Sequence, residues 1–346
     1  MINRRKFLQS SAMIGAAAAV PTSLTAKSIA TKKKLIKPPA LKKGDIIGLV
    51  TPGSPLFETQ RTLIEAKEKL HNLGFKTKVA HNVTKKLGYL AGTAQERVDD
   101  LHAMFLDDEV KAIMAVRGGY GSAQMLPLLD YKLIAEHPKI LIGLSDITSI
   151  LNGIYIETGL VTFHGPVAIS TFTDFTKKYF LNTLCSPDPV GLIDDAPYDD
   201  NLQTTNRVWT YRPGSVEGKL AGGNLTLLQS SIGTPYEFDS DGTIIFIEEV
   251  DEQPYDLDRM LNHLKQAGKF DKCKGVVFDK MKSVSAKGAS ISVEDVIDQV
   301  FGDLNIPVCI GLSFGHIKEK PTLPIGIKAR LDAGKGQLSL LEGAVE

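Results

Sequence analysis

An excess of charge of either sign is missing from this sequence. The 346 residues include 40 Lys and Arg against 40 Asp and Glu, so the formal net charge is zero when His is neutral. Domains that bind nucleic acids usually show a clustered excess of basic residues. The basic stretch from Lys27 to Lys37 lies before the first predicted strand and is interpreted as a solvated leader. The composition therefore argues against nucleic acid as a partner.

Cysteine is also scarce. The three residues, Cys185, Cys273 and Cys309, are odd in number and lack the spacing of a metal site. An exported protein could oxidise one pair, but the spacing does not say which pair. Cys273 and Cys309 stand beside apolar, strand-like runs, which favours buried free thiols. No cluster of Cys and His indicates zinc.

The N-terminal apolar run is too short to span a bilayer. Ala12 to Val20 has nine residues, whereas a membrane-spanning helix needs about 20. The run follows the adjacent arginines Arg4 and Arg5 and precedes Leu24-Thr25-Ala26, a small-residue stop. This order is typical of an export signal of the twin-arginine type. We therefore expect residues 1–26 to direct export to the periplasm, with a retained membrane anchor as the alternative. Removal of these residues leaves 37 basic and 40 acidic residues.

Short apolar runs alternate with helical patterns after the basic leader, residues 27–40. Strands are expected at 45–50, 75–80, 110–116 and 140–144, with helices over 63–73 and 94–106. Strands that alternate with helices indicate parallel βαβ units. The sequence thus predicts an α/β fold whose first domain, residues 41–167, is a doubly wound and mostly parallel sheet.

The periodicity fails between residues 168 and 212, apart from one helix near Lys177 to Leu184. We interpret this stretch as a linker or insertion that separates two domains. Apolar strands return at 243–247, 275–278 and 307–311. Residues 213–346 are therefore expected to form a second domain, of mixed α/β type.

A glycine-rich turn, Arg117 to Ser122, follows the strand predicted at 110–116 and precedes a helical start. Free backbone N–H groups at a helix N-terminus favour developing negative charge, and the Ala123 amide can help to hold an oxyanion. Ser122 is therefore a candidate nucleophile. A helix cap is the alternative. A phosphate-binding loop fits less well, because G-x-G-x-x-G and Gly-Lys-Ser/Thr are both missing.

A serine nucleophile needs a nearby base, and seven histidines are available. His164 and His316 both lie beside a glycine in loop-like segments after apolar strands, where functional groups concentrate. An acid that orients such a histidine could come from the end of the strand at 243–247. Strand alternation sends Glu248 and Glu249 to opposite faces, so only one of them can serve. These patterns choose neither between the two histidines nor between the two acids.

Six segments in the same order resemble the LD-carboxypeptidase family, also called peptidase family S66, over about residues 41–340. They are Arg117–Ser122 with Leu129–Tyr131, Gly143–Thr148, Phe163–Pro166, Gly218–Leu225, Phe246–Val250 with Pro254–Met260, and Gly311–His316.

The resemblance implies a Ser-His-Glu triad that closes across the domain interface, with Ser122 as nucleophile, His316 as general base and Glu248 as orienting acid. With this triad, His164 would line the substrate cleft. The Gly119 and Ala123 amides are the candidate oxyanion donors, and Arg117 and Tyr120 are further candidate substrate-binding side chains. The implied reaction releases the terminal D-alanine of peptidoglycan tetrapeptides and needs no metal or cofactor.

Two further functions stay open at this stage. A relative in the same family could cut an amide bond in a peptide antibiotic with the same triad. A non-catalytic periplasmic binder of wall peptides is the alternative from another class. The export signal also separates this chain from family members that recycle cell-wall peptides in the cytoplasm. A homodimer is one of the oligomeric states to be tested.

Overall fold

A computed structural model describes residues 33–197 and 208–346. The predicted export signal and the first residues of the basic leader lie outside these ranges. Within them, no helix combines the length and the apolar character that crossing a membrane requires.

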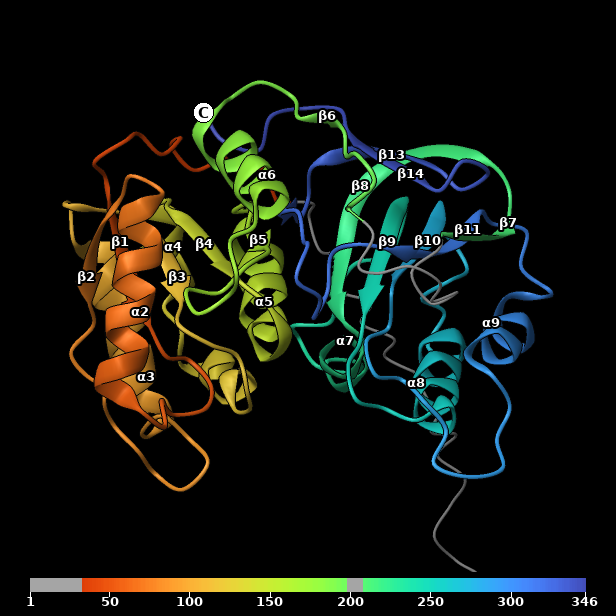
Figure 1. Cartoon of the computed structure of the whole chain (residues 1–346), viewed down its shortest axis with the longest axis horizontal. Coiled ribbons are helices and arrows are strands. Elements are labelled where there is room, and N and C mark those ends of the chain that lie inside the picture. Colours follow the sequence, from red (N-terminus) through yellow and green to blue (C-terminus); the bar gives the residue numbers. More distant parts are fainter. Residues whose placement is uncertain (1–32, 198–207) are drawn as a thin grey trace, which may run out of the picture. The chain divides into compact units, whose positions relative to one another are not determined.

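The first sheet has six strands in the order β12-β5-β4-β3-β1-β2 (Figure 1). Their bounds are Ile46–Val50 for β1, Lys76–Val79 for β2, Val110–Ala115 for β3, Ile140–Gly143 for β4, Phe163–His164 for β5 and Leu323–Pro324 for β12. Strands β1 to β5 are mutually parallel, whereas β12 runs antiparallel to β5. The doubly wound, mostly parallel sheet predicted for this region is confirmed.

Helices of the first sheet follow from local signals in the sequence. They are α2 (Thr59–Asn72), α3 (Ala94–Leu106), α4 (Tyr131–Glu136) and α5 (Thr148–Thr158), with the short 3₁₀ helices η1 (Ser122–Leu128) and η2 (Ser145–Ile147). Helix α3 begins after a capping box between Thr93 and Glu96, which satisfies amides at its first turn. Its residues Val98, Leu101 and Phe105 are buried at helical spacing. The predicted bounds of this helix are confirmed.

The strand order creates a switch point in the first sheet. Strand β1 has β2 on one side and β3 on the other, so the chain winds away from β1 in both directions. In such open sheets, ligands bind outside the carboxyl ends of the strands at this point. Two loops meet there: the Ser54 amide donates to Gly118 O at 3.3 Å, and the Tyr120 amide donates to Ser54 Oγ at 3.1 Å.

The second sheet has eight strands in the order β6-β14-β13-β8-β9-β10-β11-β7. Their bounds are Gly191–Leu192 for β6, Trp209–Arg212 for β7, Ser215–Asn224 for β8, Thr243–Glu248 for β9, Gly275–Asp279 for β10, Val308–Leu312 for β11, Lys328–Asp332 for β13 and Gln337–Leu340 for β14. Strands β8 to β11 are parallel neighbours, and antiparallel strands flank them. The associated helices are α7 (Leu225–Ser230), α8 (Pro254–Gln266) and α9 (Val293–Phe301). The predicted mixed second domain is confirmed.

The stretch 168–212 contains more regular structure than its sequence suggests. Helix α6 (Asp174–Cys185) forms where one helix was expected. Strands β6 and β7, which sequence analysis assigned to a linker, belong to the second sheet. In the other direction, β12 comes late in the sequence but joins the first sheet. The first sheet is thus completed by a strand from the C-terminal part of the chain, and the second sheet extends back into the stretch assigned to a linker.

All three cysteines are free thiols. Cys273 and Cys309 are buried, as predicted, and burial raises the pKa of each thiol to about 12. These side chains therefore act as small apolar groups of the core.

Candidate active site

Ser122 lies on the glycine turn that leaves β3 and is the first residue of η1. Gly119 and Gly121 have φ angles of 115° and 112°, in the left-handed region that favours glycine. A side chain on Gly119 would also collide with Ser54. The predicted helix start at Ser122 is confirmed, but the helix is a seven-residue 3₁₀ segment. The helix dipole therefore contributes less at Ser122 than a long α-helix would.

Asp146, in the 3₁₀ helix η2 that follows β4, binds the glycine turn that carries Ser122. Its carboxylate accepts hydrogen bonds from the amides of Gly121 at 3.2 Å and Ser122 at 2.9 Å. The Ser122 hydroxyl donates to the backbone carbonyl of Asp146. Ser122 has no exposed surface and Asp146 has almost none. In this conformation the hydroxyl is therefore bonded to Asp146 and not to a histidine, and the Ser122 amide is already occupied.

Arg97 of α3 holds the same turn from the other side. Its guanidinium donates to Pro52 O at 2.5 Å, to Gly121 O at 2.8 Å and to Gln124 Oε1 at 2.8 Å. The residue is only 2% exposed. Burial lowers the pKa of the guanidinium, and the opposing effect of the Asp146 charge is smaller. Arg97 and Asp146 thus bind opposite ends of the Gly121 residue.

Sequence analysis missed both of these residues. Arg97 stands among charged neighbours that predict an exposed helix face, although it lies one helical turn before buried Leu101. Asp146 lies in η2, shortly after the end of β4, and the carboxyl end of a parallel strand was the available signal.

Buried Glu248 and partly exposed His316 form a pair beyond the carboxyl ends of two strands of the second sheet. Glu248 is the last residue of β9 and has no exposed surface. Its Oε2 atom lies 2.6 Å from His316 Nδ1, on the loop after β11. Burial lowers the pKa of His316, but the hydrogen bond and the charge of Glu248 outweigh burial, and the net pKa is raised. The pairing occupies Nδ1, so Nε2 is the ring nitrogen left for another partner.

Glu249 is engaged elsewhere. Its Oε1 accepts from Asn224 Nδ2 at 2.8 Å, and its Oε2 accepts from the Thr226 amide at 2.9 Å and the Thr226 hydroxyl at 2.8 Å. Burial and the neighbouring charge of Glu248 raise the pKa of this carboxyl. Glu249 therefore links β9 to the start of α7, while Glu248 binds the histidine on the opposite face.

His164 is wholly buried, and its predicted place in the substrate cleft needs correction. Its Nε2 atom lies 3.2 Å from Phe314 O, and its ring packs against Phe246 at a centroid distance of 5.2 Å. Burial lowers the pKa of His164 to about 4, so the ring is neutral near pH 7. His164 therefore supports the loop that carries His316 through its bond to Phe314 O.

This loop, residues 313–322, connects the two sheets. It leaves β11 in the second sheet and enters β12, where Leu323 pairs with His164 of the first sheet. The bond between His164 and Phe314 O holds the start of the loop. The position of His316 therefore depends on both sheets.

Exposed aromatic side chains surround the nucleophile turn. Tyr120 is 59% exposed, and its ring lies 5.5 Å from that of Tyr89. The Arg117 guanidinium lies 5.3 Å from the Phe57 ring and donates to Pro55 O at 3.3 Å. Exposed aromatic groups next to a reactive turn are suited to contact a ligand.

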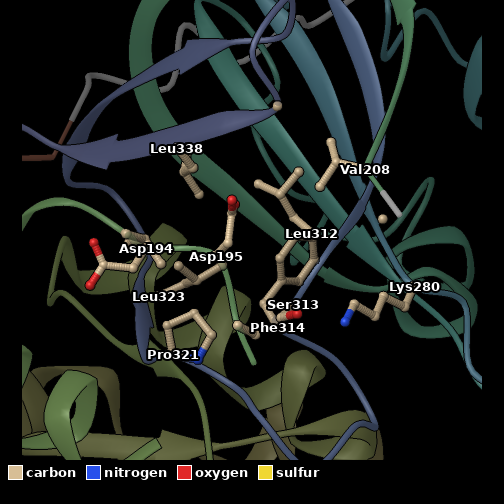
Figure 2. Close-up of a pocket in the computed structure, with 14 residues that line it drawn as sticks. Asp194, Asp195, Val208, Lys280, Leu312, Ser313, Phe314, Pro321, Leu323 and Leu338 are labelled. Atoms are coloured by element: carbon tan, nitrogen blue, oxygen red, sulfur yellow. The ribbon is translucent and has the colours of Figure 1, made fainter. Parts of the chain in front are cut away.

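A cavity lies beside both ends of the 313–322 loop. It has about 500 Å³ of empty space, which includes some open solvent. Leu312, Ser313, Phe314 and Leu323 line it together with Lys280 (Figure 2). The lining residues do not include Ser122, Glu248 or His316. Among the described residues, no group of three or more His, Cys, Asp or Glu side chains could hold a metal ion.

Fold and site together define a two-domain α/β protein with a serine on a glycine turn and a histidine paired with a buried glutamate. Residues 47–165 match the model of the LD-carboxypeptidase N-terminal domain, and residues 217–331 match that of the C-terminal domain. The chain belongs to the LD-carboxypeptidase family, peptidase family S66, and is a hydrolase of the carboxypeptidase type.

Two relatives differ in their named functions. A Bacillus subtilis protein named probable murein peptide carboxypeptidase is 39% identical over 319 residues, which cover 89% of this chain and 95% of that protein. The Escherichia coli microcin C7 self-immunity protein MccF is 30% identical over 326 residues, with 87% and 94% covered.

The solved structures similar to this chain also include a self-immunity protein and a carboxypeptidase. Wild-type apo MccF has a TM-score of 0.82 at 28% identity and covers 90% of this chain and 100% of its own. The muramoyltetrapeptide carboxypeptidase from Oxalobacter formigenes has a TM-score of 0.73 at 31% identity, with 86% and 98% covered.

Proposed function

We propose that this protein is a serine LD-carboxypeptidase that releases the terminal D-alanine from peptidoglycan tetrapeptides. The observation that carries the proposal is the 2.6 Å hydrogen bond between buried Glu248 and His316. A carboxylate on Nδ1 of a histidine is the arrangement that makes Nε2 a general base for a serine. The 39% identity to a protein named for murein peptide cleavage supports the choice of substrate.

In the proposed reaction, the Ser122 hydroxyl first turns away from the Asp146 carbonyl that it binds at rest. His316 Nε2 takes the hydroxyl proton while Oγ attacks the carbonyl carbon before D-alanine. The same proton passes to the leaving amine, and the C–N bond breaks. Water then attacks the acyl-enzyme, again with His316 as base, and restores Ser122.

The oxyanion has two proposed donors, the amides of Gly119 and Ala123. The Ser122 amide is bonded to Asp146 at 2.9 Å, so it is not a free donor in this conformation. Preorganised amides of this kind stabilise the developing charge without reorganisation. We further propose that Tyr120 and Arg117 contact the substrate at the rim of the turn, where Tyr120 is exposed.

The test uses mass spectrometry of disaccharide-free tetrapeptide incubated with the mature protein. We expect loss of one alanine with the wild type and none with Ser122→Ala. Ser230→Ala, which changes an exposed serine at the end of α7, is the matched control and should cleave normally. A tetrapeptide ending in L-alanine should stay intact. Cleavage by Ser122→Ala would remove the proposed nucleophile, and an intact D-alanine peptide with the wild type would remove the substrate assignment.

A second candidate function is cleavage of an amide in a peptide antibiotic. It is favoured by the TM-score of 0.82 to MccF, whose solved complexes include aspartyl sulfamoyl adenosine. Ser122 would serve as nucleophile in both functions, so the Ser122→Ala variant cannot separate them. The same assay with aspartyl sulfamoyl adenosine as substrate can. Release of aspartate with an intact tetrapeptide would select the antibiotic branch.

We also propose that residues 1–26 direct export by the twin-arginine route. Replacement of Arg4 and Arg5 by Lys should leave the protein in the cytoplasmic fraction. Periplasmic recovery of that variant would contradict the proposal.

A further inference from the structure

A second buried acid lies beside the Glu248–His316 pair. Asp279 is the last residue of β10, the strand next to β9, and has no exposed surface. Its Oδ1 atom accepts the Met281 amide at 2.8 Å. Its Oδ2 atom has no hydrogen-bond partner, and neither has Glu248 Oε1, although both atoms are buried. Two neighbouring acids thus each contain one unpaired oxygen.

Gly315 shows how close these acids are. A Cβ atom built on Gly315 would overlap Asp279 Oδ2 and would lie 2.8 Å from Glu248 Cβ. Gly315 therefore packs directly against both acids, and the next residue in the chain is His316. Asp279 touches the backbone that positions the histidine.

Two ionised carboxylates are unfavourable at such a place. Burial penalises each charge, and like charges that share a site prevent both groups from ionising together. Glu248 has a partner for its charge, His316, whereas Asp279 Oδ2 has none. In agreement, burial and then the charge of Glu248 raise the pKa of Asp279 well above its ordinary value.

Other charged groups around Asp279 come from three segments. Glu249, which follows β9, adds negative charge. His316 and Lys320 lie on the loop after β11, and Lys280 and Lys282 lie on the turn after Asp279 itself. No ion pair of the described residues includes Asp279. The surroundings therefore leave this acid without a dedicated counter-ion.

We propose that Glu248 and Asp279 hold one proton between them, carried by Asp279, so that this pair of acids presents only one negative charge to His316. Asp279 is then a positioning residue: its neutral carboxyl supports Gly315 and keeps a second anion away from the histidine. An ionised Asp279 would favour imidazolium and reduce the fraction of His316 that can act as a base near pH 7. The importance of this effect for catalysis rests on the proposed function, but the protonation state itself does not.

The experiment follows the His316 imidazole by NMR through a pH titration of full-length Ser122→Ala protein. Asp279→Asn replaces a neutral acid by a neutral amide of the same shape, so the His316 midpoint should stay where it is. If Asp279 were ionised, its removal would lower the midpoint by about 1–3 pH units, the usual effect of a nearby charge. That fall would overturn the proposal.

Glu248→Gln in the same background is the control for sensitivity. It removes the charge that His316 does face, so the His316 midpoint must fall. The His316 midpoint is measured without turnover. It therefore tests the protonation state of Asp279 even if the peptidase assay fails.

A measurement on the unsubstituted side chain covers the case in which Asp279→Asn does not fold. Infrared spectra of Ser122→Ala protein with isotope-labelled Asp carboxyls should show a protonated-acid band that persists at pH 7. Absence of such a band at pH 7 would overturn the proposal.

Discussion

The carboxyl ends of the strands in the two sheets contribute different chemical groups to the candidate site. At the first sheet, β3 and β4 present a serine whose surroundings are mainly backbone groups, held by Asp146 and Arg97. At the second sheet, β9 and β10 present buried carboxyl groups, and the loop after β11 presents a histidine. The first region therefore fixes the position of Ser122, and the second sets the proton affinity of His316. Substitutions in the two regions should differ in whether they move the pH profile.

The largest effect should come from His316→Ala. Loss of the base should lower kcat by a factor on the order of 10³–10⁶, because serine is a poor nucleophile without one. Steady-state cleavage of the tetrapeptide measures this, with His263→Ala, on the exposed part of α8, as the control that retains activity. A loss below about tenfold would show that another group serves as base.

Glu248→Gln should lower kcat by about 10²–10⁴-fold, because the amide no longer stabilises the imidazolium. The raised pKa of His316 depends on Glu248, and the base must be neutral to act. The acidic limb of kcat/KM should therefore lie above pH 6.5 in the wild type and move to lower pH in the variant. An unmoved limb would contradict the assignment of that limb to His316.

Asp146→Ala tests the other region. Loss of two bonds to the Gly121 and Ser122 amides should misplace the nucleophile and lower kcat by about 10–10³-fold. The acidic limb should stay in place, since His316 keeps its partner. Kinetics over pH 5–9 would test this, and a shifted limb would mean that Asp146 acts electrostatically on the base.

The smallest effect on the pH profile should come from Glu249→Gln. The amide places an N–H group against donors from Asn224 and Thr226, which should destabilise the fold by about 1–3 kcal/mol. Urea unfolding measures the change. Activity per folded molecule should remain within a few-fold of wild type, and a loss as large as that of Glu248→Gln would reverse the roles of the two acids.

Local sequence patterns were enough to predict most of the helices and strands, and to predict that Glu248 and Glu249 have different partners. Alternation along the strand at 243–247 implied that Glu248 and Glu249 point in opposite directions, and their separate partners agree. The same patterns failed for β6, β7 and β12, since these short strands pair with residues far along the chain. The site shows the same limit, because Arg97, Asp279 and His164 are buried by residues that lie far from them in the sequence.

The sequence by itself determined the family, the alternation of strands and helices, and the glycine turn that presents Ser122. Those features are local, because residue spacing and backbone freedom suffice to specify them. Tertiary structure alone decided that His316 pairs with Glu248, that His164 supports a loop and that Asp279 stands beside the pair. Such facts depend on which strand ends lie together and on how much water is excluded there, and sheet order sets both.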